Sequence, residues 1–238
     1  MRQTILILIL LTFSNSLLAQ PFAGLYKGYK NYLSDIPDSV LSEFYFKAKT
    51  QEKIIAITFD DGPLRNTQSL VSFLEKEKIP ATFFLVAKNI TPNSVHLYDN
   101  DLFSLGIHTY KHDDYRKLDY SEKEHDINQC LSIFNSYNLK VKYFRPAYGI
   151  IDGDIKVILE KNNLKGVIWS IDSQDWNGYK GDNLSNNIAK HLVGGDIILF
   201  HDRVSIKDLK SVIETIKNKD YKIVSIDKIM SYENVIPK

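Results

Sequence analysis

The sequence predicts a single α/β domain in which parallel strands alternate with helices, forming a sheet or barrel. From Lys53 onward, short β-rich runs alternate with amphipathic helical stretches, as in folds built from βα repeats. Several of the β-rich runs are almost entirely apolar, which is typical of parallel strands buried on both faces. The length of 238 residues suits one large domain better than two small ones.

The alternating pattern assigns the strands and helices in order along the chain. The strand-like runs span residues 54–59, 81–87, 105–108, 141–145, 166–171, 196–201 and 222–225. The helical stretches span residues 66–76, 121–137, 152–161, 184–192 and 206–217. Because a helix separates most successive strands, the connections are long enough for parallel pairing.

Residues 1–19 have the pattern of a secretory signal peptide. Arg2 is followed by an apolar run from Ile5 to Phe13, a short polar stretch and Ala19 at the expected cleavage point. The run is shorter than the ~20 residues that a membrane span needs, which favours cleavage over an uncleaved anchor. We therefore expect an exported protein, periplasmic or secreted, with no stable membrane span after cleavage. Residues 20–50 are an N-terminal lead-in segment, with a short helix expected near residues 39–46.

The net charge gives no indication of nucleic acid binding, and the cysteine content excludes an internal disulfide. Thirty basic residues against 29 acidic ones leave a net charge of +1, so no basic excess indicates nucleic acid binding. The single cysteine, Cys130, cannot form an internal disulfide. Its helical spacing with Ile127 and Phe134 predicts a buried thiol. We expect a monomer that is stabilised by its core.

Polar residues gather where the predicted strands end, which is where reactive groups lie in βα-repeat folds. These residues are Asp60, Asp61, His108, Arg145, Asp172, Asp175 and His201. A random distribution would place polar residues at both ends of the strands. The clustering therefore predicts a functional site at one edge of the sheet.

Two of these segments contain residues that could bind a metal. In "FDDGP", successive side chains point to opposite sides of a strand, so Asp60 and Asp61 can serve different roles, one binding a metal and one accepting a proton. The same Asp-Gly pair could simply form a turn. In "HTYKHDD", one helical turn would point His108 and His112 the same way, although such pairs often arise by chance on a surface. Two histidines and a carboxylate suit Zn²⁺ or a similar first-row ion, with positions left open.

Three further segments complete the constellation. Arg145 ends a buried strand and needs a carboxylate partner, for which Asp60 is a good candidate. His201 ends an apolar strand and could donate a proton, with Asp175 adjusting its pKa and tautomer. Trp176 offers either an aromatic face for a sugar ring or a core contact.

Five motifs follow one another over residues 53–230, namely "TFDDGP", "HTYKH", "RPAY", "DSQDW" and "LFH". Together they resemble the polysaccharide deacetylase family, the NodB-homology domain of carbohydrate esterase family 4. The resemblance implies a catalytic domain over residues 51–232. It also implies a single-domain distorted (β/α)7 barrel with the active site at the C-terminal ends of the strands.

The resemblance assigns a role to each matching residue. It implies that Asp60 is the catalytic base and that Arg145 orients it. Asp61, His108 and His112 would bind one divalent metal ion, with Zn²⁺ preferred and Co²⁺ or another first-row ion as alternatives.

The resemblance also implies roles for the residues that would contact the substrate or transfer a proton to it. Asp175 would tune His201, the general acid, and Tyr148 would contribute its backbone N–H to the oxyanion hole. Trp176 and Leu199 would shape the pocket for the acetyl methyl group. The chain departs from the family pattern at Ala147, at Asp113 and over residues 91–109, and none of these departures removes a residue named above.

The leading hypothesis is a hydrolase that removes N-acetyl groups from an acetylated polysaccharide and releases acetate. Peptidoglycan, a chitin-like polymer and an exopolysaccharide are the candidate substrates. A second hypothesis is an esterase that acts on O-acetyl groups of xylan or another acetylated glycan. A third is a non-catalytic glycan-binding module, which loss of a metal ligand or of the base would favour. No such loss is present in the sequence.

Overall fold

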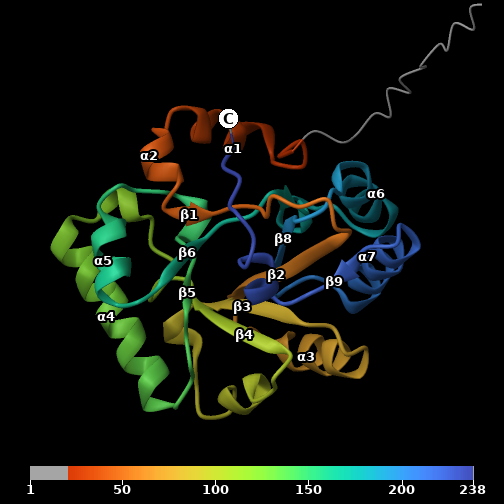
Figure 1. The fold of residues 1–238 in the computed structure, drawn as a ribbon. Coiled ribbons are helices and arrows are strands. Elements are labelled where there is room, and N and C mark those ends of the chain that lie inside the picture. The colour runs from red at the N-terminus through yellow and green to blue at the C-terminus, as the bar shows by residue number, and fades with distance from the viewer. Residues whose placement is uncertain (1–20, 238) are drawn as a thin grey trace, which may run out of the picture.

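The computed structural model describes residues 21–237, and in this part of the chain nine strands form one curled sheet (Figure 1). The strand order is β1-β6-β5-β4-β3-β2-β8-β7, with β9 paired to β2. Every one of these pairs is parallel. The strands are β1 Phe44–Tyr45, β2 Ile54–Gly62, β3 Ala81–Leu85, β4 Phe103–Ile107, β5 Tyr143–Phe144, β6 Lys165–Val167, β7 Ile171–Asp172, β8 Ile197–His201 and β9 Lys222–Ile223.

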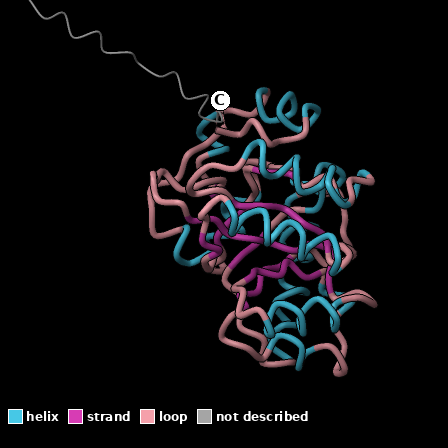
Figure 2. The backbone as a smooth tube through the Cα atoms, turned by 90° about the vertical axis from the view of Figure 1, so that its right-hand side faces the viewer, coloured by secondary structure: helices cyan, strands magenta, loops and turns pink. Residues whose placement is uncertain are grey.

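Helices surround the sheet on its outer side (Figures 1 and 2). They are α1 Lys27–Ser34, α2 Asp38–Leu41, α3 Thr67–Lys76, α4 Tyr120–Ser136, α5 Ile155–Lys161, α6 Gly181–His191, α7 Ile206–Asn218 and α8 Ile226–Ile229. Short 3₁₀ helices lie between them, of which Ala147–Gly149 and Asp175–Asn177 belong to the site described below. Within residues 21–237, no helix combines the length and the apolar character that a membrane span requires.

The curled shape of the sheet depends on one interrupted strand. The expected strand over residues 166–171 is split into β6 and β7, which are separated only by residues 168–170. β6 pairs with β5, whereas β7 pairs with β8. This short run therefore connects the two sides of the sheet and bends it toward a closed barrel, in agreement with the predicted (β/α)7 fold.

The core is built from the apolar strands that the sequence indicated. Phe59 on β2 is in register with Phe83 on β3 and with Phe200 on β8, and both ring pairs are stacked, with centroids 5.4 and 5.7 Å apart. All three side chains are fully buried. Since alternate side chains of a strand point to opposite faces, Thr58 and Asp60 share the other face of β2. One strand thus contributes both to the apolar core and to the site.

The predicted helices and strands are present with small changes of boundary. Cys130 is buried on α4, as predicted. The single helix expected near residues 39–46 is wrong, because α2 ends at Leu41 and β1 follows, paired with β6. The signal peptide predicted for residues 1–19 lies outside the described residues.

Residues 21–50 pack against the rest of the fold. The side chains of Leu25 and Leu33 are buried, and the ring of Phe22 meets that of Phe46 edge to face at 6.3 Å. The carbonyl of Gly24 accepts a hydrogen bond from the backbone N–H of Asp172 at 3.1 Å. In Figure 1, α1 and α2 lie across the top of the molecule, above β1. The lead-in segment therefore forms part of the rim around the site.

Candidate active site

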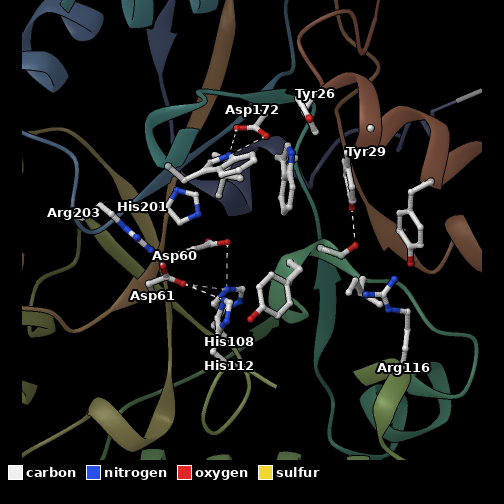
Figure 3. A pocket seen from close by; sticks show the side chains of 18 residues that line it. Tyr26, Tyr29, Asp60, Asp61, His108, His112, Arg116, Asp172, His201 and Arg203 are labelled. Atoms are coloured by element: carbon white, nitrogen blue, oxygen red, sulfur yellow. Dashed lines mark hydrogen bonds and ion pairs between the residues drawn. The ribbon is translucent and has the colours of Figure 1, made fainter. Parts of the chain in front are cut away.

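The carboxyl ends of β2, β4 and β8 surround a cavity of about 500 Å³ (Figure 3). Eight of the ten residues to which the sequence analysis gave a role in the site line it, namely Asp60, Asp61, His108, His112, Tyr148, Trp176, Leu199 and His201. The remaining two, Arg145 and Asp175, lie behind the cavity wall, where each pairs with a lining residue. The structure thus brings all ten predicted site residues together.

Asp60 is held in place by a fully buried arginine. One Nη1 of Arg145 donates to Asp60 Oδ1 at 2.6 Å and to Thr58 Oγ1 at 2.8 Å. The rest of the guanidinium donates to the carbonyls of Val167 and Ile168, at 3.0 and 2.9 Å. With its hydrogen bonds and its charge met in this way, the guanidinium can stay buried and ionised. One oxygen of Asp60 is thereby fixed, and the other faces the cavity near His108.

A β-bulge explains how two adjacent carboxylates reach the same cavity. The register of β2 on β3 shifts between Asp60 and Gly62, and Asp61 has a positive φ of 76°. A bulge inserts one residue and breaks the alternation of side chains along a strand. Asp61 therefore turns toward the same side as Asp60 instead of pointing away from it.

Asp61, His108 and His112 each offer a ligand atom, and these atoms lie within 4.8 Å of one another. Asp61 Oδ1 is 3.7 Å from Nε2 of His108 and 3.3 Å from Nε2 of His112. Nδ1 of His108 lies 2.8 Å from the carbonyl of Arg145, which can only accept a hydrogen bond. Nδ1 therefore carries the proton, and the lone pair of Nε2 faces Asp61, as in a metal-binding histidine.

The segment between the two histidines is a turn rather than the helical turn that the spacing suggested. Thr109 and His112 have positive φ values of 63° and 67°, which a right-handed helix does not allow. Thr109 Oγ1 accepts a hydrogen bond from the backbone N–H of His112, and Asp126 on α4 accepts from that of Tyr110. These side chains replace the helical hydrogen bonds and still direct both imidazoles toward Asp61.

The donor set fits a divalent cation. Asp61 Oδ1 is buried and has no hydrogen-bond partner, although burying such an atom alone is costly. Asp61 Oδ2 is paired with the exposed side chain of Arg203. Burial works to raise the pKa of Asp61, but His112, His108 and His201 outweigh it and hold that pKa below its ordinary value. Burial lowers the pKa of His108 despite the nearby aspartates, which favours the neutral, metal-binding form.

His201, which Figure 3 shows near Asp60, is paired with a carboxylate behind the cavity wall. Its Nδ1 lies 2.8 Å from Asp175 Oδ1, and its backbone N–H donates to Asp175 Oδ2, also at 2.8 Å. Burial works to lower the pKa of His201, but the hydrogen bond and the charge of Asp175 outweigh it and raise the pKa above its ordinary value. Such a histidine holds its proton more firmly near neutral pH, as a general acid must.

Asp172, which the sequence analysis counted among the polar strand-end residues without giving it a role, also lines the cavity and accepts a hydrogen bond from the indole N–H of Trp176 at 3.1 Å. Other lining residues were missed by the sequence analysis. The exposed rings of Tyr26 and Trp176 meet edge to face, with centroids 5.9 Å apart. Tyr29 lines the same cavity from α1. The helical spacing of Leu25, Tyr29 and Tyr32 or Leu33 could have indicated that α1 packs against the barrel, whereas nothing in the sequence indicates the position of Tyr26.

A profile of the polysaccharide deacetylase family matches residues 47–167 of the chain. A peptidoglycan-N-acetylglucosamine deacetylase of Bacillus cereus is 31% identical over 194 residues, which are 77% of this chain and 70% of that protein. A bifunctional xylanase/deacetylase of Pseudobutyrivibrio xylanivorans is 29% identical over 195 residues, 78% of this chain but only 32% of that longer protein. The chain belongs to the polysaccharide deacetylase family.

Solved structures of the family share the fold. A crystal structure of a peptidoglycan N-acetylglucosamine deacetylase, in complex with an N-hydroxybenzamide compound, has a TM-score of 0.74 and 29% identity. The match covers 84% of this chain and 99% of the other. A carbohydrate esterase family 4 pseudoenzyme from Bacillus anthracis has a TM-score of 0.71 at 21% identity, covering 80% of this chain and 69% of the other. Because the fold also occurs in a pseudoenzyme, activity has to be argued from the residues of the site.

Proposed function

We propose that the chain is a metal-dependent hydrolase that removes N-acetyl groups from a polysaccharide containing N-acetylglucosamine and releases acetate. The observation that carries this proposal is the arrangement around one cavity. The Asp61, His108 and His112 ligand set lines the same cavity as Asp60, which Arg145 holds, and His201, which Asp175 holds. Each of these groups has the environment that its proposed role requires.

Asp60 is proposed to act as the general base. Arg145 binds its Oδ1, so Oδ2 remains to accept a proton from the attacking water. A divalent ion bound by Asp61, His108 and His112 would polarise the acetyl carbonyl and lower the pKa of water. Zn²⁺ suits two histidines and one carboxylate, and Co²⁺ or another first-row ion would suit the same set.

His201 is proposed to protonate the departing sugar nitrogen, since Asp175 keeps its Nδ1 engaged and leaves Nε2 for the substrate. The backbone N–H of Tyr148 is proposed to stabilise the oxyanion. Tyr148 lies at the cavity rim, with its ring edge to face against that of His112 at 4.4 Å. A single oxyanion donor contributes about 10²–10³-fold to kcat in enzymes where it has been removed.

The cavity wall favours a carbohydrate substrate. Leu199 is apolar and lines the floor of the cavity, where the acetyl methyl group would fit. Trp176 and Tyr26 present exposed ring surfaces beside it, and aromatic rings of this kind can pack on the apolar face of a sugar. The partner is thus an acetylated polysaccharide, and we propose that the chain meets it after export as a monomer.

Acetate release by the purified chain tests the proposal. N-acetylated chito-oligomers, peptidoglycan and acetylxylan are offered in parallel, with chelator and with Zn²⁺ restored. Asp60→Asn keeps an oxygen for Arg145 but removes the base. We expect acetate release that needs both the metal and Asp60. No acetate from any of these polymers, despite one bound metal per chain, would contradict the proposal and favour a glycan-binding role.

O-deacetylation of xylan is the second candidate function. The similarity to a bifunctional xylanase/deacetylase favours it, although this chain covers only a third of that protein. The two functions differ in the leaving group, which is a sugar oxygen in the ester and a nitrogen in the amide. Acetate from acetylxylan with none from chito-oligomers or peptidoglycan would select the esterase.

A further inference from the structure

Helix α1 reaches across the cavity rim to the turn that carries Tyr148. Tyr29 Oη donates a hydrogen bond to the carbonyl of Gly149 at 2.8 Å. Tyr32 Oη donates to the carbonyl of Ile151 at 2.9 Å and accepts from the N–H of the same residue at 2.8 Å. Two hydroxyls from one helix therefore bind the backbone of the residues that directly follow Tyr148. Figure 3 shows the bond from Tyr29 beside the cavity.

The contact between α1 and this turn is tightly packed. The ring of Tyr29 stacks on that of Trp169, with centroids 5.0 Å apart and planes 19° apart. A Cβ atom added to Gly149 would lie 2.5 Å from the Trp169 ring and 2.7 Å from Tyr29 Oη. Gly149 also has a φ of 69°, which favours glycine. The turn is thus confined between α1 and the barrel and has little room to shift.

Tyr148 needs such support because its backbone is strained. Its φ of 60° and ψ of 8° are left-handed, a conformation that a non-glycine residue keeps only where its surroundings impose it. Tyr148 is 60% exposed, so burial of its ring adds little to the edge-to-face contact with His112 in holding the backbone. The backbone N–H groups of Gly149 and Ile150 bond within the turn, to the carbonyls of Pro146 and Ala147, and the side-chain hydrogen bonds to residues 149–151 come from α1.

We propose that Tyr29 and Tyr32 are positioning residues, whose hydroxyls hold the turn at residues 148–151 and so aim the backbone N–H of Tyr148 at the oxyanion. This inference rests on the proposed function, because Tyr148 has a catalytic role only if the chain hydrolyses an acetyl group. Both tyrosine hydroxyls are bonded to backbone groups of the turn and act on it, not on the substrate. Their effect is therefore on kcat and not on substrate affinity.

The test compares Tyr29→Phe and Tyr32→Phe with Tyr221→Phe. Each of the first two keeps its ring and loses only a hydroxyl. Tyr221 is a matched control, since its Oη donates to the carbonyl of Leu192 at 3.3 Å, outside the cavity. With N-acetylated chito-oligomers, we expect kcat to fall roughly 10- to 100-fold in the first two variants, less than full removal of an oxyanion donor. KM, bound Zn²⁺ and the pH profile should stay as in the wild type, and Tyr221→Phe should retain its activity.

A second measurement keeps the inference testable if the wild type releases no acetate. The chain contains 14 tyrosines, so labelling with [¹⁵N]tyrosine gives a simple amide spectrum in which Tyr148→Phe assigns the Tyr148 signal. The Tyr148 signal should shift or broaden in Tyr29→Phe and Tyr32→Phe but not in Tyr221→Phe. An unchanged signal in both variants would overturn the inference whatever the activity. A rise in KM with kcat unchanged would also overturn it, because the hydroxyls would then bind substrate.

Discussion

Asp60 and His201 are register partners on the neighbouring parallel strands β2 and β8. The proposed base and acid therefore come from the same level of the sheet, and the backbone ladder fixes their relation. Each is held from behind by a different partner, Arg145 for Asp60 and Asp175 for His201. The two proton-transfer groups can thus be perturbed one at a time.

Replacing Asp175 should move the basic limb of the pH profile. The hydrogen bond and charge of Asp175 raise the pKa of His201 against the opposing effect of burial. Asp175→Asn removes that charge, so His201 should lose its proton at lower pH. Because a general acid must be protonated, we expect kcat/KM to begin falling at lower pH than in the wild type. A profile with an unmoved basic limb would argue against His201 as the acid.

Replacing His112 should lower the affinity for Zn²⁺, whereas replacing a histidine outside the proposed metal site should not. His112→Ala deletes an Nε2 that lies 3.3 Å from Asp61 Oδ1. Loss of a ligand should exceed the 10–100-fold effect of a group that only orients a ligand, so we expect Zn²⁺ affinity to fall more than about 100-fold. The exposed His125 on α4 is the matched control. Titration with a competing zinc indicator measures both, and equal affinities in the two variants would contradict the assignment.

Removing the buried guanidinium should destabilise the fold as well as the site. Arg145→Met leaves Asp60 buried without its ionic partner, and breaking a buried pair in this way costs about 3–5 kcal/mol. Urea unfolding measures the loss. The double variant Arg145→Met/Asp60→Asn should regain part of it, since no unpaired charge remains. If the double variant loses as much stability as the two single variants together, the unpaired charge of Asp60 is not the cause of the destabilisation.

Neutralising Asp172 should stabilise the protein at neutral pH. Burial raises the pKa of this carboxyl from 3.8 to about 6, despite hydrogen bonds from Gln174 and Trp176. The folded chain therefore binds this proton more strongly than the unfolded chain, and stability falls as the pH rises from about 4 to about 6. Asp172→Asn retains an oxygen for both donors and carries no charge.

We expect Asp172→Asn to be more stable than the wild type at pH 7 by up to about 3 kcal/mol, because one pKa unit corresponds to about 1.4 kcal/mol. The difference should shrink to about half a kcal/mol near pH 4, where the unfolded carboxyl already holds part of its proton, and vanish at lower pH. Urea unfolding at pH 4, 5, 6 and 7 gives the dependence. A difference that does not change with pH would assign the effect to packing instead of charge.

The sequence predicts the parallel arrangement well, because the apolar runs of β2, β3 and β8 are buried on both faces and leave little ambiguity. It also places Asp60, His108 and His201 correctly, since the ends of parallel strands meet at one edge. The bulge at Asp61 and the positive φ at His112 are not predictable in this way. The bulge belongs to the pairing of β2 with β3, and the turn at His112 is held by a hydrogen bond from the Tyr110 N–H to Asp126 on α4, so both depend on contacts with other segments of the chain.

The contribution of α1 is missed for a related reason. The segment is short and rich in tyrosine and lysine, and although Leu25, Tyr29 and Leu33 are spaced as on one helix face, this spacing does not indicate which surface the helix packs on. Its stability comes from Leu25 and Leu33 packing on the barrel and from tyrosine hydroxyls that bind a distant backbone. Such bonds carry no periodic signal, and they become visible only when the turn after Pro146 is seen beside the helix.

The docking of α1 also bears on how the protein should be produced and modified. The family profile begins at residue 47, and a recombinant fragment trimmed to that boundary would uncover Trp169 and leave the turn at residues 148–151 without its two tyrosine bonds. Such a fragment would expose new apolar surface and be prone to aggregate. Purification tags are better joined ahead of residue 21 or at the C-terminus. A design that transfers this cavity rim to a related protein has to include α1 as well as the barrel.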